Sequence, residues 1–223
     1  MSQEPVVKQT KIENVIFSLD TERIGLYGED FAVGVSIQDE DGNELESLFL
    51  MFNPDRALGL ADDRLWIKEN VLPALQDEQI NCRSANEMEE RFWAFYLAAK
   101  AKYNMVVIAD CGAPCEAGFF AQCVMSDMSN RKWDAPYPLH EVGTAMLLAG
   151  YDPTATYERR GNELPKHNPL ADARQSARLW RAACQKIKTG KTDLFYASGA
   201  SGASGASGAS GTDASGTACC KHE

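Results

Sequence analysis

Short apolar runs separated by polar turns dominate the opening part of the chain. Residues 14–20 are apolar and rich in β-branched side chains, which predicts a buried strand with Asp20 at its carboxyl end. Residues 31–38 and 46–52 are further strand candidates, and the Asp-Gly pair within residues 39–43 is typical of a hairpin turn. We therefore expect a three-stranded antiparallel meander at the start of the fold.

Helical periodicity replaces this pattern from residue 62 and is strongest in residues 84–102, where apolar side chains recur three and four positions apart. Ser84 and Glu87 have the spacing of a capping box, so this helix should begin there. Its stripe of large apolar side chains is expected to pack in the core, and comprises Met88, Phe92, Phe95 and Tyr96 or Leu97.

A strand, a turn and a helix are predicted next. Residues 105–110 form the most strand-like run after the meander, and Asp110 stands at its carboxyl end. Pro114 suits a first helical turn, and the apolar helical pattern continues to about Met125. Residues 136–142 are rich in proline, which cannot donate to a central ladder, so they should form an edge strand or an extended connection.

The last helix has clear signals at both ends. Asn168 suits the N-cap and Pro169 the first helical position, and the helix should end near Lys188, ahead of Gly190. Its predicted buried stripe comprises Leu170, Ala173, Ala177, Trp180, Cys184 and Ile187.

These elements predict one α/β domain over residues 11–191, built on a mixed sheet in which an antiparallel meander and parallel strands are flanked by helices. Residues 1–10 are expected to form a flexible N-terminus. Residues 192–223 contain repeated Ala-Ser-Gly triplets, which cannot bury apolar area, so we expect a low-complexity flexible tail.

Composition and charge exclude some classes of protein. The formal net charge of −10 argues against a protein that coats duplex nucleic acid, although it allows an enzyme that grips only a strand end. The sequence has neither an apolar run long enough for a membrane span nor a secretory signal, so we expect a soluble, cytoplasmic protein. The seven cysteines fit a reducing compartment, and Cys111 and Cys115 lack the second pair that a zinc site would need.

Acidic residues stand at the ends of two predicted strands. Asp20 and Glu22 are two positions apart, so their carboxylates should project to the same side and could hold a divalent cation. Asp110 ends a different strand, and functional groups converge at the carboxyl ends of strands in α/β sheets. A single such acid is often merely solvated. Acids on two strands favour a metal site.

A histidine and an acid flank the start of the last helix. Asp172 lies in its first turns, where the positive end of the helix dipole favours the carboxylate. His167 precedes the N-cap, and the same positive end opposes its protonation, which would keep the imidazole available as a base near neutral pH. The alternative is a histidine that only caps or packs in a loop.

The residues around these acids resemble the motifs of a known nuclease family. Residues 17–22, Phe-Ser-Leu-Asp-Thr-Glu, resemble the first motif of the DEDDh 3′→5′ exonucleases, relatives of RNase T, oligoribonuclease and polymerase proofreading subunits. Residues 167–174, His-Asn-Pro-Leu-Ala-Asp-Ala-Arg, are similar to their third motif, in which four residues separate the histidine from the aspartate. The resemblance spans roughly residues 14–187 and implies a ribonuclease-H-like fold.

The resemblance also implies a reaction. Two Mg²⁺ or Mn²⁺ ions would orient a terminal phosphodiester of single-stranded nucleic acid, and nucleoside 5′-monophosphates would be released from the 3′ end. Asp20, Glu22, Asp110 and Asp172 become the metal ligands, and His167 becomes the general base that takes a proton from the attacking water.

The second motif departs from the family pattern, in which an asparagine is followed four residues later by the aspartate. Here Asp110 stands where the asparagine is expected and Pro114 occupies the later place. Either Asp110 or Glu116 supplies the third carboxylate, and the sequence favours Asp110. The Thr-Gly that often follows the first motif is also missing, and the residues that could still pack on the terminal base are Arg23, Ile24 and Leu26.

Several features of the sequence allow more than one interpretation. Basic residues recur along the last helix and before it, and they fit phosphate tracking and a solvated surface equally well; they are Arg159, Arg160, Lys166, Arg174, Arg178, Arg181 and Lys188. A homodimer could use Trp93, Tyr96 or Trp133. RNA or short oligonucleotides are favoured as substrates because a single domain offers little surface for a long duplex.

Two other functions compete with an exonuclease. A catalytically silent nucleic-acid-binding or scaffolding protein would explain the altered second motif and the negative charge, but it would not need His167 and the acids to be kept together. A metal-dependent phosphatase or nucleotidase would use similar acids without the histidine element.

Overall fold

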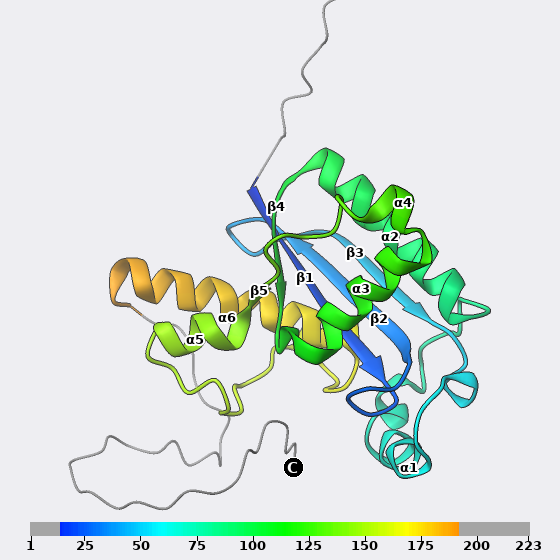
Figure 1. Cartoon of the computed structure of the whole chain (residues 1–223). Coiled ribbons are helices and arrows are strands. Elements are labelled where there is room, and N and C mark those ends of the chain that lie inside the picture. Colours follow the sequence, from blue (N-terminus) through cyan, green and yellow to red (C-terminus); the bar gives the residue numbers. More distant parts are fainter. Residues whose placement is uncertain (1–13, 192–223) are drawn as a thin grey trace, which may run out of the picture.

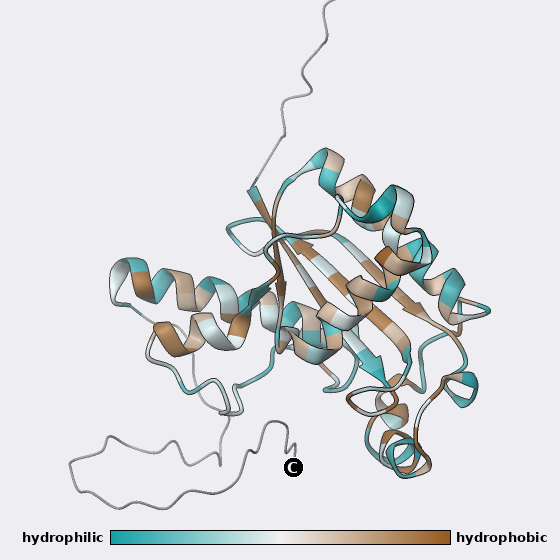
Figure 2. Ribbon diagram, viewed as in Figure 1, coloured by the Kyte–Doolittle hydropathy of each residue, from teal (hydrophilic) through white to brown (hydrophobic). Residues whose placement is uncertain are grey.

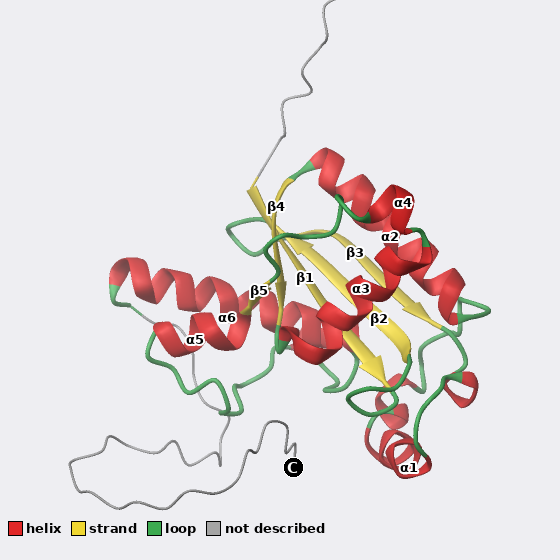
Figure 3. Cartoon of the chain, viewed as in Figure 1, coloured by secondary structure: helices red, strands yellow, loops and turns green. Residues whose placement is uncertain are grey.

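The computed structural model describes residues 14–191, which form a five-stranded mixed sheet with helices on both faces (Figure 1, Figure 3). The strand order is β3-β2-β1-β4-β5. The strands are β1 (Asn14–Arg23), β2 (Asp30–Gln38), β3 (Glu44–Met51), β4 (Asn104–Ala109) and β5 (His140–Glu141). Strands β1 to β3 are antiparallel, whereas β4 runs parallel to β1 and β5 parallel to β4. The predicted α/β class and mixed sheet are confirmed.

The hairpin between β2 and β3 follows its Asp-Gly signal. Gly42 has a φ of +94°, and the backbone N–H of Asn43 donates to the Asp39 carboxylate at 2.8 Å. A side chain at the glycine position would be strained in this conformation, which explains why the turn needs the Asp-Gly pair.

Helices cover both faces of the sheet (Figure 1). The helices are α1 (Ala61–Asn70), α2 (Ala85–Lys102), α3 (Ala117–Ser126), α4 (Met128–Arg131), α5 (Val142–Leu148) and α6 (Pro169–Thr189). Short helical turns lie at η1 (Pro54–Arg56), η2 (Leu72–Leu75), η3 (Gly112–Glu116) and η4 (Gly161–Glu163). Helices α2 and α3 pack on one face of the sheet, and α6 packs on the other with α5 against it.

Strand β1 divides the core between these faces. Phe17 and Leu19 join the apolar cluster of α2 and α3, whereas Ile16 joins the cluster of α5 and α6. Because side chains alternate along a strand, Asp20 and Glu22 lie on the α6 side. The prediction that the strand ends at Asp20 is wrong, since pairing with β2 continues through Arg23 and supports these polar residues in extended form.

Helix α2 begins where its capping signal predicted. The Ser84 hydroxyl accepts the N–H of Glu87 at 3.3 Å, although the Glu87 carboxylate in turn accepts the N–H of Arg83 and not that of Ser84. Trp93 and Tyr96 are only 4% and 2% exposed and are therefore not available for a dimer face, whereas Trp133, the third residue considered for it, is 86% exposed. Trp93 and Tyr96 pack in the core beneath α2, where Tyr96 lies edge-on to Phe17.

Helix α6 is capped at both ends as expected. The Asn168 side chain accepts the N–H groups of Leu170 and Ala171, and Gly190 closes the helix with a φ of +72°. Ala173 and Ala177 are buried as predicted, but Ile187 is 56% exposed because the last turns run past the edge of the sheet (Figure 1). Helix α5 was not predicted, since seven residues give too little periodicity to separate it from the connection before it.

Within residues 14–191, no helix is both long and apolar enough to cross a bilayer. The predictions for residues 1–10 and 192–223 fall outside the described residues.

Candidate active site

The hydrophilic end of β1 carries the first two candidate acids (Figure 2). Asp20 is partly buried, and Glu22 is 9% exposed. Asp20 lies opposite Gly34 of β2, where the absence of a side chain leaves room for another element to approach the sheet.

The amino end of α6 occupies this place and brings in the third motif. The Asn168 amide donates to the Glu78 carboxylate at 2.8 Å, which ties the N-cap to the segment after η2. His167 has a φ of +65°, a left-handed conformation that is uncommon outside glycine. Its backbone N–H donates to Oδ2 of Asp172 at 3.1 Å, so the strained residue is held by the acid of the same motif.

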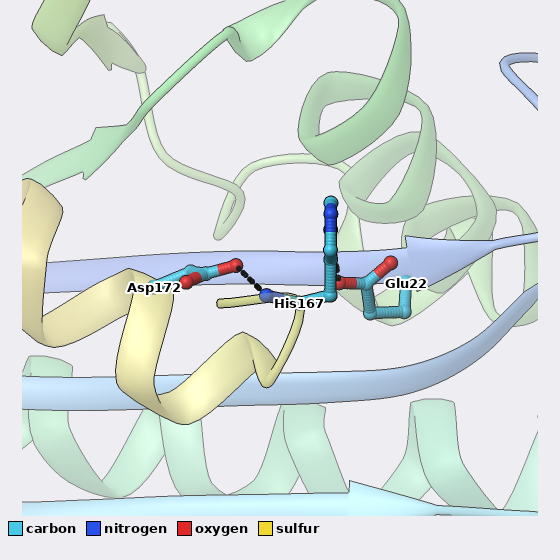
Figure 4. Close-up of side chains that lie close together, drawn as sticks. All are labelled: Glu22, His167 and Asp172. Carbon is cyan, nitrogen blue, oxygen red and sulfur yellow. Dashed lines mark hydrogen bonds and ion pairs between the residues drawn. The ribbon is translucent and has the colours of Figure 1, made fainter. Parts of the chain in front are cut away.

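The side chains of Glu22, His167 and Asp172 meet at this point (Figure 4). Each offers a ligand atom, and these atoms lie within 4.8 Å of one another; Nδ1 of His167 is 3.9 Å from Oε1 of Glu22. Among the residues that the structure describes, this is the only group of three or more potential metal ligands packed so closely. Cys111 and Cys115 are not members of this group.

The acids raise one another's pKa. Burial raises the pKa of Asp20 well above its usual value, and the negative charges of Asp172, Glu116 and Glu22 raise it further. Burial and the charge of Asp172 act in the same way on Glu22. The pKa of Asp172 is also raised by burial, although the neighbouring Arg159 opposes the shift. Such uncompensated negative charge is what a bound divalent cation would neutralise.

The two candidates for the third carboxylate differ in their surroundings. Asp110 directly follows β4 and is exposed. Glu116 is 4% exposed, and its Oε2 has no hydrogen-bond partner among the described residues. Burial, together with the charges of Asp110 and Asp30, raises the pKa of Glu116 to about 8. A buried carboxylate oxygen without a partner is costly, and its charge reaches both Asp20 and Glu22.

Next to His167 lies an aromatic side chain that the sequence did not single out. Trp66 of α1 is 41% exposed, and its ring stands edge-on to His167 with centroids 5.7 Å apart. A hollow of about 810 Å³ opens next to the loop after β1, and its apolar lining includes Leu26, Tyr27, Leu58 and Leu60.

Two of the residues suggested for packing on a terminal base are not available for it. Ile24 is 2% exposed and belongs to the core. Arg23 is buried and pairs with Asp30 at 2.9 Å, while its other terminal nitrogen donates to the carbonyl of Pro114. Leu26, at 42% exposure, is the one of the three that faces outward.

Two arginines of the basic stripe on α6 are bound into the fold. Arg174 makes two hydrogen bonds to Glu44, both 2.8 Å long. Arg178 is buried and makes two to Glu163, at 2.6 and 2.8 Å. Neither of these arginines therefore forms a solvated face or an open track for phosphate.

Comparison with known proteins gives a likeness of fold and little similarity of sequence. No protein-family model and no curated protein matches the sequence. Among solved structures, the nuclease domain of 3′hExo, a DEDDh family member bound to rAMP, matches with a TM-score of 0.45 and 10% identity, over 82% of this chain and 95% of that one.

Two further solved structures match less closely. A 3′-exonuclease that recognises the 3′ end of a histone mRNA stem-loop and a full-length 3′-exonuclease each have a TM-score of 0.42 and 12% identity, over 81% of this chain. The matches cover 65% and 62% of those longer chains. The likeness concerns the course of the backbone, so the function of this chain has to be inferred from its own residues.

Proposed function

We propose that this chain is a metal-dependent nuclease that removes nucleotides from the 3′ end of single-stranded nucleic acid. One observation carries the proposal: Glu22, His167 and Asp172, drawn from two distant motifs, bring their ligand atoms within 4.8 Å of one another. Their spacing along the sequence is that of the DEDDh motifs, and a silent scaffold would have no need to keep these residues together.

The acids fit divalent metal ions such as Mg²⁺ or Mn²⁺, which prefer carboxylate oxygen ligands. Asp20, Glu22 and Asp172 would hold them. We propose that Glu116, in preference to Asp110, supplies the remaining carboxylate, which is the acid of the second motif. The reason is that Glu116 is buried with an oxygen that has no partner among the described residues, whereas Asp110 is exposed. Bound metal would polarise the scissile phosphate and lower the pKa of a water molecule.

His167 is the proposed general base. Its side chain is 20% exposed, so water can reach the imidazole, and it stands within 3.9 Å of Glu22. The edge-on contact with Trp66 and the backbone hydrogen bond to Asp172 restrict the positions of the ring and of the residue that carries it. A fixed base next to the metal ligands can take the proton from the attacking water.

The surroundings favour a strand end over a long duplex as substrate. The described arginines of α6 are paired internally, and the net charge is −10, so few cations remain to follow a duplex backbone. The ring of Trp66 beside His167, and the exposed Leu26 in the loop after β1, could instead pack on an unstacked terminal base. RNA or short oligonucleotides remain the favoured substrates.

Incubation of the purified full chain with 5′-labelled RNA and DNA oligonucleotides, in Mg²⁺, Mn²⁺ or EDTA, tests the proposal. We expect a ladder that shortens from the 3′ end and disappears with EDTA and in His167→Ala. Intact oligonucleotides in every metal, from protein shown to be folded, would instead support a silent nucleic-acid-binding protein. Release of phosphate from mononucleotides without strand shortening would indicate a phosphatase.

A further inference from the structure

We propose that Arg159 binds a phosphate oxygen of the substrate at the proposed active site. Arg159 lies outside the motifs, in the connection that leads from α5 to η4. The proposal rests on the proposed function, because the phosphate belongs to the nucleic acid substrate. The argument follows from how the segment is anchored, how the guanidinium is bonded and what charge surrounds it.

Residues on both sides of Arg159 are hydrogen-bonded to Arg178 of α6. The guanidinium of Arg178 donates to the carbonyl of Glu158 at 2.7 Å and to the carboxylate of Glu163 at 2.6 and 2.8 Å. Arg178 and Glu163 are 8% and 2% exposed, so this pairing is largely shielded from water. Arg159 therefore extends from a rigid support, which lowers the entropy lost when its side chain holds a ligand.

The guanidinium of Arg159 reaches a proposed metal ligand and still has donors to spare. Its Nη1 donates to the carbonyl of Glu163 at 2.8 Å and to Oδ1 of Asp172. Within residues 14–191, these two hydrogen bonds both start from Nη1, which leaves Nε and Nη2 for a ligand. The Arg159 side chain as a whole is 17% exposed, so it is partly open to solvent. In Arg174, by contrast, Nε and Nη2 both donate to the carboxylate of Glu44.

The negative charge of the site explains why a phosphate would need a positively charged partner there. Asp20, Glu22, Glu116 and Asp172 would repel an anionic phosphodiester, and a planar guanidinium fork matches the geometry of phosphate oxygens. Arg159 is also attracted to the carboxylate of Asp172 and opposes the rise of its pKa. As a fixed positive charge it should weaken metal binding while it strengthens substrate binding. These opposite effects separate a phosphate-binding arginine from one that only supports Asp172.

The test compares Arg159→Gln with Arg160→Gln, which removes the same charge from the adjacent, exposed side chain. Binding of Mn²⁺ to the metal-binding site is measured by calorimetry without nucleic acid, and kcat and KM are measured on a single-stranded oligonucleotide. We expect Arg159→Gln to bind Mn²⁺ at least as tightly as the wild type but to lose about 10- to 100-fold in kcat/KM, the size of one charged hydrogen bond. Arg160→Gln should match the wild type.

Arg159→Lys keeps the charge but loses the fork, so it should recover part of the lost kcat/KM. Parallel loss of Mn²⁺ affinity and activity in folded Arg159→Gln would overturn the proposal, because the arginine would then only hold Asp172 in place. Equal activity of Arg159→Gln and Arg160→Gln in an active protein would also overturn it, while leaving the nuclease function intact. A wild-type chain that degrades no oligonucleotide would overturn both proposals.

Discussion

Gly34 and Leu170 lie backbone against backbone: a Cβ built on Gly34 would stand 2.1 Å from the backbone nitrogen of Leu170. Gly34 is also the partner of Asp20 across β1 and β2. The missing side chain therefore allows the first turn of α6, which carries Asp172, to settle directly beside the acid of the first motif. This contact joins the two motifs of the candidate site.

Replacement of Gly34 by alanine should separate these motifs. The added methyl group must push α6 away from β2, which we expect to lower the free energy of unfolding by about 1–3 kcal/mol and to weaken Mn²⁺ binding. Urea unfolding and calorimetric titration measure the two effects. Gly161→Ala is the matched control, because a Cβ there meets nothing within 4 Å. Wild-type Mn²⁺ affinity in Gly34→Ala would show that the close approach does not set the site.

Glu116 and Asp110 can be distinguished by neutral replacements of the same shape. Glu116→Gln should lower kcat by about 100-fold or more, since it removes a buried carboxylate from a proposed metal site. Asp110→Asn should have a smaller effect, because that carboxylate is exposed. Single-turnover degradation of a labelled oligonucleotide over a range of Mg²⁺ concentrations measures both. A larger loss in Asp110→Asn would return the third carboxylate to the end of β4.

The raised pKa of Glu116 should make the stability of the metal-free protein depend on pH. The carboxyl of Glu116 keeps its proton up to a pKa of about 8 in the folded state, whereas the ordinary pKa of a glutamate is 4.5, so folding binds a proton in the pH range between them. The contribution of Glu116 to the free energy of unfolding is therefore fully present below about pH 4.5. This contribution is lost as the pH rises through about 8.

Thermal unfolding in EDTA at pH 5 to 8 checks this dependence. Glu116→Gln should flatten the decline and be more stable than the wild type at pH 8, and added Mg²⁺ should restore wild-type stability there. Glu69→Gln, on the exposed surface of α1, serves as the control. A decline just as steep in Glu116→Gln would mean that this carboxyl does not carry the proton.

His167→Ala separates catalysis from metal binding. The carboxylates would still hold the ions, so Mn²⁺ affinity should change little, whereas loss of a general base should reduce kcat by about 100- to 10,000-fold. His140→Ala, on β5, controls for the loss of an imidazole elsewhere in the chain. Loss of Mn²⁺ binding in His167→Ala would instead identify the imidazole as a ligand.

The sequence predicted those parts of the fold that depend on local signals. The hairpin at Gly42, the capping of α2 by Ser84 and the capping of α6 by Asn168 each follow from residues within a few positions of one another. The rule that strand ends meet at one edge of a sheet predicted that Asp20 and Asp110 would meet, but the close group of possible ligands instead joins Glu22 of β1 to His167 and Asp172 at the start of α6.

Other features depend on contacts between distant segments. Burial of Glu116 results from the packing of the turn before α3 against β1. The edge-on contact of Trp66 with His167 joins residues that are 101 positions apart in the sequence. The pairing of Arg174 with Glu44 likewise spans 130 positions. No periodicity or local motif marks such pairs, so the basic stripe could not be told from a solvated face.

The backbone of His167 is left-handed, and its N–H donates to the carboxylate of Asp172. This hydrogen bond connects the proposed general base directly to a proposed metal ligand. Under the proposed function, an ion that draws the Asp172 carboxylate to a new position would also shift the backbone N–H of His167 that this carboxylate holds. A cation as large as Ca²⁺, which needs longer metal–oxygen distances than Mg²⁺, would then bind and still misdirect the base. In the proposed mechanism the size of the ion would therefore affect both its binding to the carboxylates and the orientation of His167.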